Sequence, residues 1–182
     1  MPVEIELVPP TVALRGEVAD CLADFAGTPV DGSGIADPAR PPLRDDDWIE
    51  FVTGRLAEED PETELVDGWV HCTSRWIRDI GTGEVLGFLA VRHRLTPFLL
   101  ETGGHIGYSV RPGARRRGVA TAALALGLEI AAGLGIDPVL ITCDTDNTAS
   151  RRTIEGTGGT LEDVRDGTRR YWIGAGEPPE PR

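Results

Sequence analysis

The sequence contains no lysine, so every basic side chain is an arginine. The codon usage of a GC-rich genome, which favours Arg, Ala, Gly and Pro, explains this bias without any function. Acidic residues outnumber basic ones by 30 to 18, and the formal net charge is -12. This charge argues against general binding of nucleic acids and against attachment to anionic membranes. It is compatible with a cationic or amine substrate.

The sequence also lacks a long apolar run and a secretion signal. The most apolar segment, residues 119–136, contains Glu129 and several small residues, which favours a packed helix over a membrane span. The N-terminal residues MPVEIELVPP include two acidic side chains and no basic region followed by an apolar stretch. We therefore expect neither a leader peptide nor a membrane anchor.

Cysteine is scarce, with three residues at Cys21, Cys72 and Cys143. Their number is odd and their spacing matches no metal site, so they are typical of reduced thiols. These observations predict a cytoplasmic protein without a bound metal.

Length and hydrophobic periodicity predict one α/β domain over residues 1–174, with a disordered tail at 175–182. A chain of 182 residues can bury about 70% of its unfolded surface. We predict strands at 3–8, 69–77, 85–95, 103–110 and 138–143, with a final hairpin at 160–174, and helices at 12–26, 46–59, 119–134 and 148–156. The predicted fold class is an α+β sandwich, with a mixed, mostly antiparallel central sheet of about seven strands flanked by helices. Residues 106–134 form the only predicted parallel crossover.

The positive charge of this acidic chain is concentrated at the start of the third predicted helix. Four arginines lie within residues 111–117, in the stretch RPGARRRGVA, and residues 102–128 contain no acidic side chain. A helix N-terminus presents free backbone N–H groups and a partial positive charge, which together bind anions such as phosphate. Gly118 allows close approach of the backbone to such an anion. The stretch therefore predicts a phosphate-binding turn, although surface arginines exposed to solvent explain it as well.

The surrounding motifs make the prediction more specific. The pattern R-x-x-G-x-A (Arg115, Gly118, Ala120) follows a strand that ends in V-x-P, and D-N-x-x-S (Asn147, Ser150) follows the next strand. This arrangement resembles the GNAT superfamily of N-acetyltransferases, most specifically over residues 85–174. The segments RHRL, GGHIGYSVRP, LITCD and RYWI also resemble a bacterial subgroup of predicted acetyltransferases. The resemblance implies the GNAT acyl-CoA acyltransferase fold, with acetyl-CoA as cosubstrate and no metal.

The resemblance also implies roles for individual residues. The backbone of Tyr108, Ser109 and Val110 would pair with the pantetheine arm. Asn147 and Ser150, which follow the next strand, would contact acetyl-CoA. The turn would hold the pyrophosphate through Arg115, Arg116, Arg117, Gly118, Val119, Ala120 and Thr121. Asn147 also fits the N-cap of a helix, and both roles can coexist.

The family's usual proton donor is absent. Many relatives carry a tyrosine seven residues after the asparagine, and this sequence has Ile154 there. An alkylamine with a pKa of about 10.4 is almost entirely protonated at neutral pH, so a base would help the reaction. The candidates for catalytic base or acid are Glu101, His105 and Tyr108. Residues 105 and 108 point to opposite faces of a regular strand, so at most one should face the cleft, and His105 equally fits a histidine hydrogen-bonded within the sheet.

Three functions are compatible with these features. The first is an acetyl-CoA-dependent N-acetyltransferase that transfers the acetyl group directly to a primary amine, either a small molecule or a protein. The second is a non-catalytic acyl-CoA-binding or sensing module, which the substitution at Ile154 supports. The third, a mononucleotide phosphate binder, lacks the Gly-Lys-Ser/Thr end of such turns. Residues 27–68 are expected to shape the acceptor pocket, and a homodimer is a further expectation from the fold.

Overall fold

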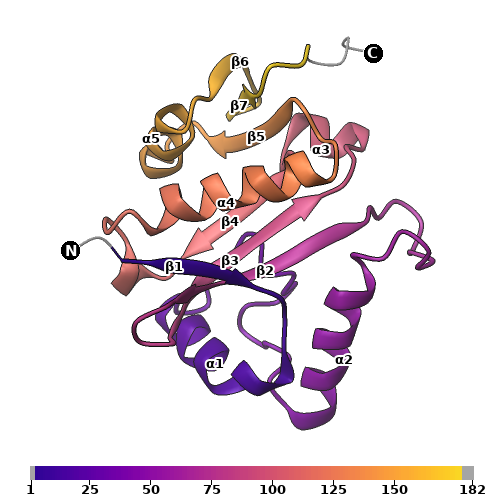
Figure 1. Cartoon of the computed structure of the whole chain (residues 1–182), viewed down its shortest axis with the longest axis vertical. Helices are drawn as coiled ribbons and strands as arrows, with labels where there is room; N and C mark the ends of the chain where they lie inside the picture. The colour runs from indigo at the N-terminus through magenta and orange to yellow at the C-terminus, as the bar shows by residue number, and fades with distance from the viewer. Residues whose placement is uncertain (1–2, 178–182) are drawn as a thin grey trace.

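The chain folds into two antiparallel β-sheets that meet at one edge and are flanked by helices, as the computed structural model shows for residues 3–177 (Figure 1). The first sheet has the strand order β1-β2-β3-β4 and the second β5-β7-β6. The elements are β1 (Ile5–Val8), α1 (Arg15–Asp24), α2 (Asp45–Ala57), β2 (Cys72–Asp79), β3 (Val85–Arg92), α3 (Pro97–Glu101), β4 (Ile106–Val110), α4 (Val119–Gly133), β5 (Val139–Asp144), α5 (Thr148–Gly156), β6 (Thr160–Arg165) and β7 (Thr168–Ile173).

The seven predicted strands are all present, which confirms the mixed α/β class, but they form two sheets rather than one. β4 and β5, which α4 connects, run in the same direction as predicted for residues 106–134 (Figure 1). They contact each other only near their first residues and then diverge. The ladder of backbone hydrogen bonds between neighbouring strands is therefore interrupted between β4 and β5.

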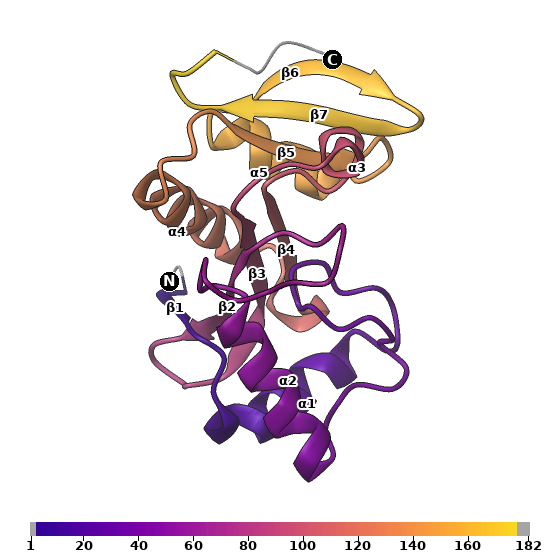
Figure 2. The ribbon, with the colours of Figure 1, turned by 90° about the vertical axis from the view of Figure 1, so that its right-hand side faces the viewer.

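Helices cover the first sheet from both sides, and Figure 2 shows α1 and α2 at the end of the molecule opposite β6 and β7. α4 packs against β1, β3 and β4 on one face, whereas α1 packs on β3 and α2 on β2 on the other. β3 is buried on both faces, so its successive side chains enter two different cores. Phe88 packs with Trp48 and Trp76, and Leu89 packs with Ile106 and Leu124. The alternation of a strand explains how one strand serves both cores.

The apolar spacing of residues 119–134 predicts a buried stripe at Val119, Ala123, Leu126, Ile130 and Leu134, and this prediction is partly wrong. Val119 and Ala123 are buried as expected, but the buried face continues through Leu124, Gly127 and Ala131, a set that leaves out Leu126 and Ile130. A Cβ on Gly127 would lie 2.9 Å from Cδ1 of Leu89, so the glycine lets the helix approach the sheet closely. Small residues therefore decide which side of α4 faces the sheet.

Several boundaries also differ from the predicted ones. β2 begins at Cys72, and Trp69, predicted to lie in this strand, is 54% exposed. The short helix α3 was not predicted, although Thr96 caps it through the N–H of Leu99 and Pro97 occupies its first turn. Residues 178–182 of the predicted tail lie outside the described residues.

Candidate active site

The junction between the two sheets is made by His105 and Leu140. The backbone N–H of His105 donates to the carbonyl of Leu140 at 2.7 Å, and the N–H of Leu140 donates to Nδ1 of His105 at 2.9 Å. The N–H of Gly103 donates to Oγ1 of Thr142 at 2.8 Å. These contacts hold the first residues of β4 and β5 together. Beyond them the structure has no hydrogen bond between the backbones of these two strands in residues 3–177, and the strands open into a V.

His105 is buried at the apex of this V and is not part of the cavity lining. Burial, with a smaller contribution from the positive charge of Arg92, lowers the pKa of His105 to about 4. The imidazole is therefore neutral at physiological pH, which suits its role as acceptor from Leu140.

This pKa predicts a specific loss of stability in acid. Between pH 6.5 and about 4 the unfolded histidine takes up a proton that the folded one does not bind, so the free energy of unfolding falls with decreasing pH. The loss amounts to about 1.4 kcal/mol per pH unit and ends near the folded pKa. In a His105→Asn variant the amide oxygen can replace Nδ1 as acceptor without titrating. Urea unfolding at several pH values in this window should show a shallower decline for the variant, and equal slopes would contradict the assignment.

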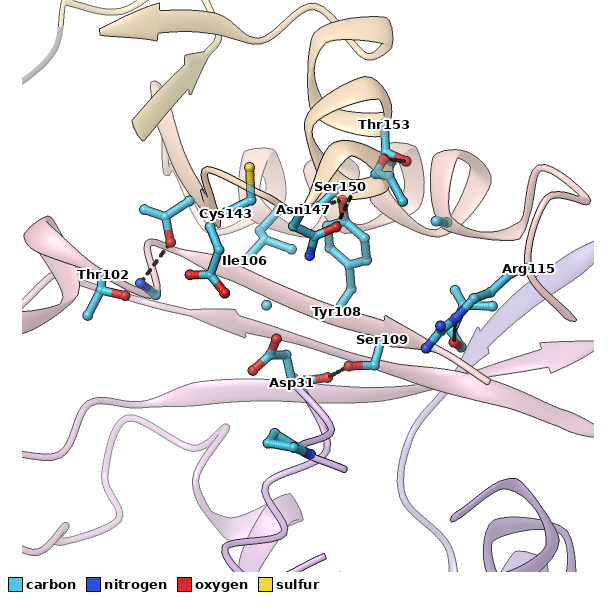
Figure 3. Close-up of a pocket in the computed structure, with 18 of the residues that line it drawn as sticks. Asp31, Thr102, Ile106, Tyr108, Ser109, Arg115, Cys143, Asn147, Ser150 and Thr153 are labelled. Carbon is cyan, nitrogen blue, oxygen red and sulfur yellow. Dashed lines mark hydrogen bonds between the residues drawn. The ribbon is translucent and has the colours of Figure 1, made fainter. Parts of the chain in front are cut away.

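The V encloses a cavity of about 440 Å³. Figure 3 shows Tyr108 rising from β4 toward Ser150, Arg115 on one side, and Asp31 reaching the cavity from the loop that follows α1. β4 pairs with β3 along one edge only, so its other edge is open to the cavity. Arg92, Ser109, Asp144, Asn147 and Thr153 also line the cavity.

The turn before α4 forms one end of this cavity. Gly118 is the N-cap of α4 with φ 81°, and a Cβ at this position would meet nothing within 4 Å. The backbone N–H groups of residues 116–121 have no acceptor among residues 3–177. Arg115 donates from Nε to the carbonyl of Val110 at 3.0 Å, whereas the side chains of Arg116 and Arg117 are exposed. Free donors, open space and positive charge therefore coincide, as an anion site requires.

The polar pair after β5 lies beside Tyr108. The side-chain oxygen of Asn147 accepts from the N–H of Ser150 at 3.0 Å, so the N-cap role is present. The hydroxyl of Tyr108 and Oγ of Ser150 are 3.0 Å apart, and both residues line the cavity. Burial raises the pKa of Tyr108, partly offset by hydrogen bonds to Ser150 and Thr153. The phenol is therefore protonated at neutral pH and able to donate.

The remaining catalytic candidate and the substituted position lie elsewhere. Glu101 accepts from Nη1 of Arg165 at 2.8 Å and is not in the lining of the cavity. Ile154 is fully buried in the core between α4, β5 and β7. Of the three candidates, the structure brings only Tyr108 into the cavity.

Three charged residues of the lining were missed by the sequence analysis. Asp31 belongs to an irregular loop, Arg92 ends β3, and Asp144 ends β5. Neither carboxylate has a hydrogen-bond or ion-pair partner among residues 3–177. No motif surrounds Asp31 in the sequence. Only the position of Asp144 at the end of a buried strand, where functional side chains often gather, could have indicated it.

Comparisons with known proteins agree with this architecture. The structure resembles Mycobacterium smegmatis RimJ in complex with CoA-disulfide, with a TM-score of 0.68, 22% identity, and coverage of 95% of this chain and 85% of that one. It also resembles the microcin C7 self-immunity acetyltransferase MccE in complex with acetyl-CoA and AMP, with a TM-score of 0.64, 17% identity, and coverage of 94% and 93%. A third similar structure is an acetyltransferase of Salmonella typhimurium that modifies the N-terminal serine of a ribosomal protein, with a TM-score of 0.63, 16% identity, and coverage of 94% and 95%.

Sequence comparison identifies the family directly. No curated protein matches the chain. The acetyltransferase (GNAT) domain, however, matches residues 22–160, which include the turn before α4, both diverging strands and the Tyr108–Ser150 pair. The resemblance inferred from the motifs is confirmed, and the chain belongs to the GNAT family of acetyltransferases.

Proposed function

We propose that this protein is an acetyl-CoA-dependent N-acetyltransferase, which transfers the acetyl group directly to a primary amine in a ternary complex. The observation that carries the proposal is the continuity of the cavity. One cavity is lined by Arg115 and Ala120 at the anion-binding turn, by the Tyr108–Ser150 hydroxyl pair, and by Asp31 from a separate loop. Both substrates can therefore meet at the hydroxyl pair.

The residues of the turn fit the pyrophosphate of acetyl-CoA. The unpaired N–H groups of residues 116–121 supply donors, the positive φ of Gly118 turns them outward, and the missing Cβ leaves room for an anion. The open edge of β4, at Tyr108, Ser109 and Val110, would hold the pantetheine arm, and Asn147 would contact it from the other wall. When bound, acetyl-CoA supplies an acetyl group activated as a thioester.

The hydroxyl pair is suited to protonate the departing thiolate. Tyr108 and Ser150 share a hydrogen bond of 3.0 Å, so a proton lost by one hydroxyl can be replaced through the other. A thiol with a pKa of about 8.5 is also a tolerable leaving group without full protonation. This arrangement can compensate for Ile154 at the position of the usual tyrosine.

We assign His105 and Glu101 structural roles rather than roles in proton transfer. Nδ1 of His105 is engaged by Leu140, and the pKa of about 4 makes the imidazole a weak base. His105 acts as a positioning residue at the apex of the V. Glu101 is paired with Arg165 outside the cavity.

Release of free thiol from acetyl-CoA tests the function. The purified protein should release thiol only when a suitable primary amine is added, and mass spectrometry should show the acetylated amine. A Tyr108→Phe variant should retain acetyl-CoA binding by calorimetry while its kcat falls by about tenfold or more, since a positioned proton donor contributes about 10²–10⁴ and Ser150 remains. Tight binding without turnover across a broad panel of amines would instead support the acyl-CoA-binding or sensing module.

The nature of the acceptor and the cellular setting belong to the same proposal. MccE and the Salmonella enzyme are named for different roles, in microcin immunity and in modification of a ribosomal protein, so the fold alone does not choose between a small-molecule and a protein amine.

No helix in residues 3–177 is long and apolar enough to cross a membrane. A cytoplasmic location, absence of a metal or nucleic-acid partner, and a homodimer stay predictions.

A further inference from the structure

The end of the cavity that Asp31 lines, which we call the acceptor end, contains a charged subsite on a loop that is held in place. The loop that carries Asp31 is fixed against β4, because Oγ of Ser109 donates to the carbonyl of Asp31 at 2.8 Å. A Cβ on Gly32, whose φ is +77°, would lie 2.4 Å from the carbonyl oxygen of Gly107, so the two backbones are in close contact. The buried side chain of Ser33 closes the turn through the carbonyl of Val30 at 2.7 Å. Asp31 is thus held at a defined place.

Three charged groups line this part of the cavity. Asp31 comes from the loop, Asp144 from the end of β5, and Arg92 from the end of β3. Nη1 of Arg92 donates to the carbonyls of Gly103 and Gly104, at 3.0 and 3.1 Å, which anchors the guanidinium. With both carboxylates ionised the subsite has a net charge of -1. A single positive charge would neutralise it.

The environment of Asp31 favours proton acceptance. Its side chain is accessible through the cavity, but the surrounding protein desolvates the carboxyl and raises its pKa. Arg92 lowers the pKa and the negative charge of Asp144 raises it further. Tyr108 is the titratable group that β4 contributes to the same cavity. A carboxylate with a raised pKa is a stronger base than an ordinary aspartate.

We propose that Asp31 and Asp144 together bind the ammonium group of the acceptor, and that the acceptor is a monocationic primary amine without a carboxylate on the carbon next to the nitrogen. This inference rests on the proposed function and specifies its substrate class. The bound ammonium first gives one proton to Asp31, which leaves a neutral amine. As this nitrogen attacks, its bond to the acetyl carbon forms and the carbon–sulfur bond breaks. The thiolate receives a proton from the Tyr108–Ser150 pair, and the second proton lost by the nitrogen restores the pair.

Net charge is the reason for this choice of acceptor. A zwitterionic amino acid would bring a carboxylate to a subsite that is already negative, and Arg92 is partly used by the two backbone carbonyls. A monocation adds no such repulsion. Like charges placed close together repel each other.

Matched pairs of amines test the substrate class. Tyramine with tyrosine and phenethylamine with phenylalanine differ in the carboxylate, and thiol release gives kcat/KM for each. We expect the member without the carboxylate to be preferred by about tenfold or more in each pair that reacts. Preference for the amino acids would overturn the inference while leaving the acetyltransferase function intact. Absence of thiol release with every amine would instead contradict the proposed function.

Asparagine variants test the residues. Asp31→Asn and Asp144→Asn should each raise KM for the preferred amine by about 10- to 100-fold, the effect of losing a charged hydrogen bond, with the dissociation constant for CoA unchanged. Asp146→Asn is the matched control, because Asp146 is on the same turn as Asp144 but does not line the cavity. Unchanged kinetics in both cavity variants would overturn the inference.

The pH profile separates proton acceptance from binding alone. In the unaltered protein kcat/KM should fall as the pH drops through the raised pKa of Asp31, because the protonated carboxyl can neither bind an ammonium ion nor accept its proton. Asp31→Asn should remove this acidic limb, and Asp31→Glu should retain it. An acidic limb that persists unchanged in Asp31→Asn would overturn the role of Asp31 as proton acceptor.

Discussion

Gly118→Glu should abolish measurable binding of CoA while leaving the protein folded. The new carboxylate would lie beside the free N–H groups at the start of α4, where we place the pyrophosphate. Repulsion between like charges at a binding site costs several kcal/mol, which corresponds to a loss of affinity of about 100-fold or more. Isothermal titration calorimetry with CoA measures this directly.

The same substitution should have little effect on folding. A Cβ on Gly118 meets nothing within 4 Å, so the main cost is a non-glycine residue at φ 81°, about 1–2 kcal/mol. A negative charge at a helix N-terminus recovers part of this cost. Gly135→Glu is a matched control, since Gly135 has φ +74°, equally open space and a position after the other end of α4. Unchanged CoA affinity in Gly118→Glu, or an equal loss in Gly135→Glu, would disprove the location of the pyrophosphate.

Gly104→Ala should strongly destabilise the protein, because Gly104 lies where the two sheets touch. A Cβ at this position would be 2.5 Å from the carbonyl oxygen of Leu140 and 3.2 Å from Cα of Ile141, and its φ is +59°. Both neighbours are backbone atoms, so the strands themselves must separate. We expect the free energy of unfolding to fall by about 3 kcal/mol or more, from overpacking and backbone strain together.

A second glycine provides the contrast. Gly133 lies in the last turn of α4, and a Cβ there meets nothing within 4 Å. Gly133→Ala should therefore stabilise the protein by about 0.5–1 kcal/mol through helix propensity. Urea unfolding of both variants gives the comparison. Similar stability of Gly104→Ala and the unaltered protein would show that the junction adapts, and the V would then not be fixed by backbone contact.

Part of the candidate site could be predicted because its determinants are local. The turn at residues 115–121 follows a strand that Pro112 ends and precedes a helix, and both features are properties of neighbouring residues. Free N–H groups at a helix start exist in every helix, so the arginines and Gly118 were sufficient to indicate an anion site. The N-cap role of Asn147 is also a local motif, whereas a contact of Asn147 and Ser150 with acetyl-CoA was implied only by the resemblance to the family.

The other part depended on contacts between distant segments. From the sequence, the ordinary pKa of a histidine and the position of His105 made it a candidate base. The structure places His105 at the apex of the V, where its Nδ1 accepts a hydrogen bond from the N–H of Leu140, 35 residues away. Asp31 and Asp144 share the cavity only because the loop after α1 is fixed on β4. The face of α4 was misjudged because Gly127 lies against Leu89 of β3, where a Cβ would be 2.9 Å from Cδ1 of that side chain.

The sequence by itself determined the α/β class, the order of the strands and of the helices other than the short α3, and the glycine turn before α4, because periodicity and capping act between residues close in the chain. The tertiary structure alone decided that the seven strands divide into two sheets, that Tyr108 rather than His105 faces the cavity, and that Asp31 and Asp144 line the same cavity. These features arise from the divergence of β4 and β5, which depends on backbone contacts at Gly104 and Leu140 between segments that folding brings together.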